Sequence, residues 1–241
     1  MTRESLLART LVELADTLVA EFDIVDLLML LADRCVEVLD VQAAGIMLAG
    51  PDGQLRVMAS SSEAMRFLEL CEVQAQEGPC FDSYNSGQAV VNQDLDADNG
   101  RWPRFAAQAV DAGFHSAHAL PMRLRGSVIG ALNLFRNDVG ELGPEDLEIA
   151  QALADVATIG IFQHRASLED QLPATPLTHV VKSRIRLEQA KGMLSERLNL
   201  DMEQSFAALR NHARNHNHPL SEVAQSVIDG SLITPALDDE P

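Results

Sequence analysis

The chain has 241 residues, of which 46% are hydrophobic, with a formal net charge of −18. This length accommodates one sizeable domain and a small appendage. Because no run of about 18 apolar residues and no signal peptide is present, the sequence argues against a membrane protein. Three cysteines at unrelated spacings fit a reducing compartment, so we expect a cytoplasmic protein.

The acidic charge is unevenly distributed along the chain. Residues 1–179 carry 11 Lys and Arg against 27 Asp and Glu, whereas residues 180–231 carry 7 against 6. The last ten residues add three acids and no base. Since phosphates are repelled by carboxylates, a nucleic acid could bind only the C-terminal region, and such binding should be sensitive to salt.

The first two thirds of the chain predict helices at both ends with strands between them. Apolar residues at helical spacing predict helices over 7–18 and 24–39. The runs 43–49 and 55–60 flank a Gly50-Pro51-Asp52-Gly53 turn and predict a hairpin, and 116–124 with 128–135 predict a second one. Further helices are expected over 62–73, 79–87, 102–112 and 145–165, with a strand over 89–92. This pattern indicates an α+β domain, with an antiparallel sheet and helices on both sides.

Several motifs in this region resemble those of GAF domains that precede an ANTAR domain in actinobacterial proteins. They are E-G-P-C (Glu77–Cys80), D-L (Asp94-Leu95), R-W-P-x-F (Arg101–Phe105), A-L-P-M-R-L-R-G (Ala119–Gly126) and I-G-A-L-N-L-F (Ile129–Phe135). The resemblance implies a small-molecule sensor with a pocket between the sheet and the helices on one face. It also implies that the domain often dimerises through its terminal helices.

The helix expected to end near Asn199 has two apolar stripes. Val180, Leu187, Ala190, Leu194 and Leu198 share one face, and Val181, Ile185 and Gly192 form a second stripe that is nearly opposite. The second stripe predicts a partner helix. Gly192 indicates either close approach by another helix or a ligand, or a tolerated glycine.

Two shorter helices follow in the sequence. Asp201 with Gln204 predicts a capping box that opens one of them, and Ser221 is expected to cap the other. The patterns Ala190-Lys191-Gly192, Phe206 to Arg210, Ala213 to Asn217 and Leu220 to Ala224 resemble the ANTAR domain, a bacterial antitermination module that binds paired RNA stem-loops as a dimer. Where that family often carries Ser, this chain has Ala213.

The sequence thus predicts a GAF sensor domain with flanking helices over 1–167 and a linker over 168–179. A three-helix ANTAR domain over 180–231 and an acidic disordered tail over 232–241 complete the chain. The predicted RNA-binding residues are mostly polar and basic, because cations and planar side chains contact phosphates and unstacked bases. They are Arg184, Lys191, Arg210, Arg214, Asn217 and His218, together with Gly192, where a ligand could approach the backbone closely.

Four residues of the first domain are candidates for contact with a ligand or signal. Cys80 near a helix start is either a redox-reactive thiol or a small buried residue. His115, His118 and Trp102 either contact a ligand or pack within the domain. Asp94, Asp96 and Asp98 lack the spacing of a calcium loop, so we expect no metal site. No cofactor is indicated beyond an unknown small molecule in the GAF pocket.

We expect a signal-responsive RNA-binding antitermination regulator that forms a homodimer. One alternative is a DNA-binding regulator, but the last helix has no Lys or Arg to read base edges, so the sequence argues against DNA as a partner. Another is a kinase-like sensor of a two-component pathway, but Arg165 follows His164 and no glycine-rich ATP lid follows. No set of nucleophile, base and orienting residue is present, so we expect no catalysis.

Overall fold

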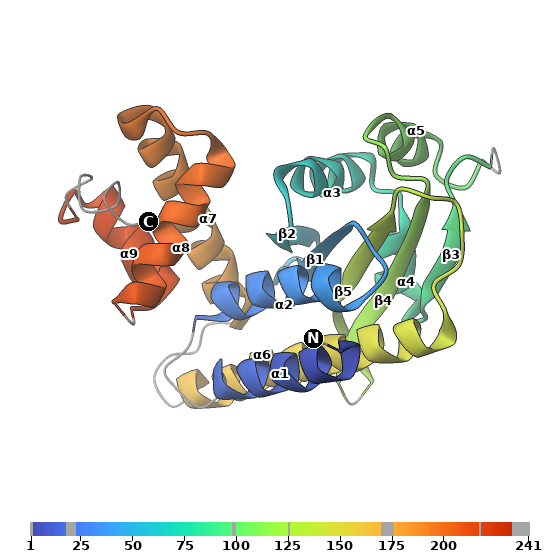
Figure 1. Ribbon diagram of the computed structural model, residues 1–241, viewed down its shortest axis with the longest axis horizontal. Helices are drawn as coiled ribbons and strands as arrows, with labels where there is room; N and C mark the ends of the chain where they lie inside the picture. The colour runs from blue at the N-terminus through green and yellow to red at the C-terminus, as the bar shows by residue number, and fades with distance from the viewer. Residues whose placement is uncertain are drawn as a thin grey trace.

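The computed structural model describes residues 2–17, 23–97, 100–124, 126–169, 176–216 and 218–232. Its N-terminal domain contains a five-stranded antiparallel sheet with strand order β2-β1-β5-β4-β3 (Figure 1). The strands are β1 (Ala43–Ala49), β2 (Leu55–Ser60), β3 (Val90–Asp94), β4 (Ser116–Leu124) and β5 (Ser127–Arg136). Both predicted hairpins are confirmed, since β1 pairs with β2 and β4 pairs with β5.

Helices cover both faces of this sheet, as predicted for the α+β domain. On one face lie α2 (Ile24–Val38) and α6 (Pro144–Glu169), with α1 (Arg3–Thr17) packed against both. On the other face lie α3 (Glu63–Ala75), α4 (Pro79–Ser86) and α5 (Pro103–Asp111). Alternation along β1 sends Ile46 and Leu48 into the core beneath α2, while Met47 packs near Cys80 of α4. Every residue of β1 is therefore buried, because neither face of a central strand meets solvent.

The described part of the C-terminal domain, residues 176–216 and 218–232, contains three helices: α7 (Pro176–Leu198), α8 (Met202–Asn215) and α9 (Leu220–Ile228). The predicted capping box opens α8, since Asp201 and Gln204 each accept from the other's backbone amide. The predicted apolar face of α7 is buried against α8 and α9 through Leu187, Ala190 and Leu194.

The two domains are packed against each other rather than held apart. Helix α7 contacts α2, α6 and β2, and α9 contacts α2, so a single apolar cluster runs from the sheet through α2 into the C-terminal helices. Figure 1 shows α7 standing beside the end of α2, with α8 and α9 on its far side. The predicted domain limits and linker stay predictions; α6 extends to Glu169 and α7 begins at Pro176.

The predicted cap of the last helix is wrong, and the reason is this packing. Helix α9 begins at Leu220 after Pro219, so Ser221 lies inside its first turn. The amide of Ser221 donates to Asp23 Oδ2 at 2.7 Å, while Asp23 Oδ1 accepts from Val25 N at 2.9 Å. One carboxylate of the N-terminal domain thus accepts bonds at the starts of both α2 and α9, where orphan amides need acceptors.

Gly130, from the I-G-A-L-N-L-F motif, allows β5 to approach β1. A Cβ at Gly130 would lie 2.0 Å from the backbone oxygen of Met47. We predict that Gly130→Ala lowers the free energy of unfolding by about 2 kcal/mol or more, because backbone cannot move aside cheaply. Urea unfolding followed by circular dichroism measures the change.

Gly192→Ala provides the control for this variant. It adds the same methyl group inside α7, where the new Cβ would have no atom within 4 Å apart from its own chain neighbours and the nearby backbone of the helix. It should raise the free energy of unfolding by about 0.5–1 kcal/mol, because alanine favours helices. An unchanged urea midpoint for Gly130→Ala would contradict the close approach.

Candidate functional site

Cys80 lies in the first turn of α4 and is fully buried. Its thiol is 3.8 Å from the carbonyl oxygen of Ala131. Burial, followed by the nearby carboxyls of Glu72 and Glu69, raises the pKa of the thiol well above its usual value. Because redox chemistry needs an accessible thiolate, these surroundings favour the second sequence interpretation, a small buried residue.

Two carboxyl groups lie fully buried beside Cys80, and no cation forms an ion pair with either among the described residues. Glu72 Oε1 accepts from the amide of Cys80 at 2.7 Å, and its Oε2 is 3.0 Å from Asn133 Nδ2. Glu69 Oε2 accepts from the hydroxyl of Ser60 at 2.6 Å. Burial raises the pKa of Glu72 to about 8 and raises that of Glu69 as well, so both carboxyls favour the protonated form.

The sequence analysis missed this buried acidic pair. Glu69 and Glu72 are three residues apart on α3 and read locally as the polar side of an amphipathic helix. Space for them comes from two glycines, since a Cβ at Gly45 or Gly78 would lie 2.2 or 2.3 Å from a Glu69 or Glu72 oxygen. Gly78 in the E-G-P-C motif could have signalled close approach, but it does not identify the approaching group.

The acidic residues around Trp102 join α4 to α5. Glu77 Oε1 accepts from the amides of Arg104 and Phe105 at 2.6 and 3.0 Å, at the start of α5. Trp102 Nε1 donates to Asp82 Oδ2 at 3.1 Å, and the ring meets Phe105 edge-on. The E-G-P-C and R-W-P-x-F motifs therefore have structural contacts, and Trp102 is almost fully buried.

The two candidate histidines lie apart from Cys80 in different surroundings. His115 Nδ1 is 2.8 Å from Asp96 Oδ2 on a partly exposed turn. His118 is fully buried, and its Nδ1 accepts from the amide of Asn92 at 2.9 Å, where a bulge interrupts β3. Burial, and then Arg136, lowers the pKa of His118 to about 4, so the ring is neutral. Cys80, Trp102, His115 and His118 thus have separate sets of contacts within the described residues.

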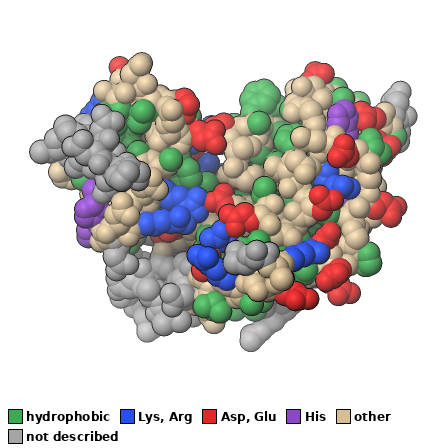
Figure 2. All heavy atoms as spheres, in the orientation of Figure 1, with side chains coloured by type: hydrophobic (Ala, Val, Ile, Leu, Met, Phe, Trp, Pro, Cys, Tyr) green, Lys and Arg blue, Asp and Glu red, His purple; other side chains and the backbone are tan. Residues whose placement is uncertain are grey.

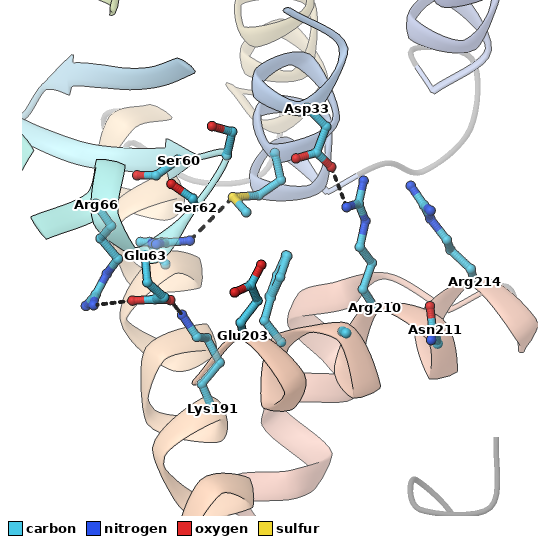
Figure 3. Close-up of a pocket in the computed structure, with 15 residues that line it drawn as sticks. Asp33, Ser60, Ser62, Glu63, Arg66, Lys191, Glu203, Arg210, Asn211 and Arg214 are labelled. Carbon is cyan, nitrogen blue, oxygen red and sulfur yellow. Dashed lines mark hydrogen bonds and ion pairs between the residues drawn. The ribbon is translucent and has the colours of Figure 1, made fainter. Parts of the chain in front are cut away.

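Three of the predicted RNA-binding cations lie instead at the junction of the two domains. Arg184 and Lys191 on α7 are buried, although they are the charged flank of a helix in the sequence. Lys191 Nζ is 2.6 Å from Glu63 Oε1 at the start of α3. Arg210 on α8 pairs with Asp33 on α2 (Figure 3).

Further contacts complete the junction between α7 and the N-terminal domain. Arg184 Nη1 lies 3.6 Å from the sulfur of Met29 on α2, and its Nη2 is 2.9 Å from Glu188 Oε1. Arg66 on α3 pairs with Glu188 at 2.8 Å. Burial alone would raise the pKa of Glu63, but its hydrogen bond to Lys191 and the charges of Lys191 and Arg66 outweigh this and lower it.

A cavity of about 280 Å³ lies within this junction. Its walls come from α2, the segment from Ser60 to Arg66, α7 and α8, and Figure 3 shows their charged groups around one space. In the space-filling view, Lys and Arg side chains gather where the C-terminal helices meet α2, beside Asp and Glu side chains (Figure 2). Sequence reasoning identified Arg184, Lys191, Arg210 and Arg214 but missed Asp33, Glu63 and Arg66.

The remaining RNA-binding candidates lie outside the ion pairs. Arg214 lines the cavity, and it forms no ion pair or hydrogen bond with the described part of the chain. Gly192 and His218 are exposed, and Asn217 lies outside the described residues. Within those residues no helix is long and apolar enough to cross a membrane, and no three His, Cys, Asp or Glu side chains cluster as metal ligands would.

The fold and the junction define a two-domain protein in which an α+β domain packs directly on a helical module. A family model described as "GAF domain" matches residues 23–161, and one described as "ANTAR domain" matches residues 176–228. Because the first covers more than half of the chain, the protein belongs to the GAF domain family, and its architecture is that of GAF-ANTAR proteins.

Solved structures resemble the GAF part of the chain. The GAF domain of a phosphoenolpyruvate-protein phosphotransferase from Acinetobacter is 15% identical, with a TM-score of 0.53, and covers 73% of this chain and 100% of its own. A free methionine-R-sulfoxide reductase from Neisseria meningitidis is 17% identical, with a TM-score of 0.52, and covers 69% and 95%. At such identities the likeness shows the fold alone, and no curated protein matches the chain.

The buried carboxyl of Glu72 should make the stability of the GAF domain depend on pH. Its pKa is about 8 in the folded protein, against 4.5 for the unperturbed group. Between these values the unfolded state releases a proton that the folded state keeps, so the free energy of unfolding falls as pH rises. Glu69 acts in the same direction, whereas His118 affects stability only below about pH 6.5.

We predict that Glu72→Gln reduces this dependence between about pH 6.5 and pH 8, where the wild type should lose on the order of 1 kcal/mol per pH unit. The amide can still accept from Cys80 N, and it can donate to the amide oxygen of Asn133, which has no partner among the described residues. Urea midpoints across this range measure the slope. Identical slopes for wild type and variant would contradict the raised pKa, and Glu148→Gln on α6 is the control.

Proposed function

We propose that this protein is a signal-responsive, RNA-binding transcription antitermination regulator. The GAF domain senses a small molecule or redox signal and controls how the ANTAR domain binds paired RNA stem-loops. The observation that supports this most is the junction, where cations of the ANTAR domain pair with carboxylates of the GAF domain. Control of RNA binding by the GAF domain then has a direct physical route.

Phosphate binding requires cations that can release counterions and approach the RNA backbone. The Lys191 side chain is only 3% exposed, and its ammonium group is held by Glu63 and Glu188. Arg184 is similarly buried, and Arg210 is held by Asp33. We therefore propose that the docked arrangement is the covered state of the site, in which RNA would compete with GAF carboxylates for Lys191 and Arg210.

The covered state depends on ion pairs and on apolar packing between the domains. Ion pairs that are partly removed from water gain attraction but lose hydration, so their net contribution is small. A signal that separates the domains must therefore mainly offset the packing of α7 and α9 on the GAF domain, and it does so by favouring the separated state over the docked one. The buried Cys80 thiol favours a small-molecule signal over a redox one.

The proposed RNA-binding form is a homodimer in the cytoplasm. Ile185 on the second stripe of α7 is 52% exposed, and Val181 beside it is half-buried. A second copy would cover this stripe. A DNA-binding role has less support, because α9 buries Leu220, Val223, Ala224 and Val227 against its neighbours and carries no basic residue. GAF and ANTAR domains are regulatory domains, and we propose no catalytic role.

The test frees the cations of the ANTAR domain by neutralising the carboxylates that pair with them. We predict that the double variant Asp33→Asn with Glu63→Gln, called the released variant, binds an RNA carrying two stem-loops about tenfold more tightly than wild type at moderate salt. Fluorescence anisotropy measures the affinity. Adding Lys191→Ala and Arg214→Ala to the released variant should abolish the gain.

The matched control is Asp111→Asn with Glu141→Gln, which removes two exposed carboxylates of the GAF domain away from the junction. A similar gain in this control would mean that only net charge matters. If neither the released variant nor wild type binds the RNA at low salt, the proposed function is wrong.

A further inference from the structure

We propose that the cavity between the GAF and ANTAR domains binds a small phosphate-bearing anion that holds the two domains together. This inference rests on the proposed function, since it adds an effector to the same junction. The cavity differs from the sensor pocket expected between the sheet and its covering helices, because it lies at the outer edge of the GAF domain and is formed by side chains of both domains.

The cavity has a positive lining in a strongly acidic protein. Five cationic and three acidic side chains border it, whereas the whole chain carries a net charge of −18. Glu188, outside this lining, pairs with Arg66, Arg184 and Lys191, so the excess of positive charge lies mainly at Arg214 beside the Arg210–Asp33 pair. A local excess of this kind attracts anions. The cations are Arg66, Arg184, Lys191, Arg210 and Arg214, and the acids are Asp33, Glu63 and Glu203.

Two arginines have donors that the protein does not use. Arg210 pairs with Asp33 through Nη1, but its Nε is buried with no hydrogen-bond partner in the described part of the chain. Arg214 lies one turn further along α8 and extends beside Arg210 in Figure 3; its side chain is partly exposed and has no hydrogen-bond acceptor within the described residues. Burial, and then the charge of Arg210, lowers the pKa of Arg214 against the attraction of Asp26 and Asp33. Because Arg210 is already paired with Asp33, Arg214 is the guanidinium that a bound anion would pair with most directly.

Hydroxyl groups on the opposite wall complete a donor set. Ser61 Oγ accepts from the amide of Ala44 at 3.0 Å, and Ser62 Oγ accepts from the amide of Met65 at 3.2 Å. Both hydroxyl protons stay available to a ligand that accepts hydrogen bonds. Since Ser62 is the N-cap of α3, the helix dipole adds partial positive charge on this side.

The size and chemistry of the cavity fit a phosphate better than a larger ligand. A volume of about 280 Å³ is at the small end of ligand pockets. Guanidinium groups bind phosphate oxygens in pairs, and hydroxyls on the other side can reach its remaining oxygens. Phe206 and Met29 also line the cavity, so the compound that carries the phosphate can be partly apolar.

A ligand that contacts both domains binds the docked state better than the separated state, and it therefore stabilises the docked state. It also occupies cations that RNA would need. Both effects act in the same direction, so the anion should weaken RNA binding.

The test uses inorganic pyrophosphate as the probe, titrated calorimetrically into the full chain at constant ionic strength. We expect saturable binding of one pyrophosphate per chain. Arg214→Gln should weaken it about tenfold, because one charge-assisted hydrogen-bonding group is lost. Arg197→Gln, which removes an exposed charge at the end of α7 outside the cavity, should change it less than about twofold.

A further measurement separates a free phosphate from RNA phosphates as the occupant. In wild type, pyrophosphate should lower RNA affinity in the anisotropy assay by more than chloride of equal ionic strength does.

Absence of saturable binding, or equal binding by wild type and Arg214→Gln, overturns the cavity as the site. Tighter RNA binding with pyrophosphate overturns the direction of control. If the protein binds RNA but does not bind pyrophosphate, this inference is wrong and the proposed function is not affected.

Discussion

The contact between the carboxylates of α2 and α3 and the cations of α7 and α8 is the interaction on which the rest of the arrangement depends. The chain separates its charge, with residues 1–179 acidic and the ANTAR region close to neutral. Docking brings the few cations of the second region to acids of the first, at the pairs Lys191–Glu63 and Arg210–Asp33. Since water can replace either partner and phosphate can replace the carboxylate, these pairs select an orientation more than they supply stability.

Apolar packing and helix capping make the docked orientation specific. The cluster that begins at the sheet continues through α2 into α7 and α9. The two oxygens of Asp23 accept amides at the starts of α2 and α9, so a shift of one helix against the other breaks a hydrogen bond. Helix α3 also connects the inside of the GAF domain to the junction. Glu69 and Glu72 lie beneath it against the sheet, while Glu63 at its start holds Lys191.

Local sequence information was sufficient for the elements and insufficient for the junction. Turn residues and apolar periodicity predicted both hairpins, the capping box at Asp201 and the buried face of α7, because each depends on neighbours within a few residues. Lys191 and Glu63 are 128 residues apart, and each reads locally as a solvated charge. Ser221 failed as a cap for the same reason, since its amide bonds to Asp23 from another domain. Burial of Glu72 depends on the missing side chain of Gly78, which constrains space but not chemistry.

The position of the second stripe of α7 couples the proposed dimer to the same docking contact. Val181 and Ile185 line an apolar groove together with Leu70 of α3 and Val57 of β2. Arg184 and Glu188 border the same groove. A second α7 helix is about 10 Å wide, so if it packed on this stripe in the docked state it would overlap with α3 and the edge strand β2. Separation of the domains would therefore expose the cations and clear the stripe in one step. A single docking equilibrium can thereby control both requirements of the proposed RNA-binding form, its free cations and its pairing of two chains.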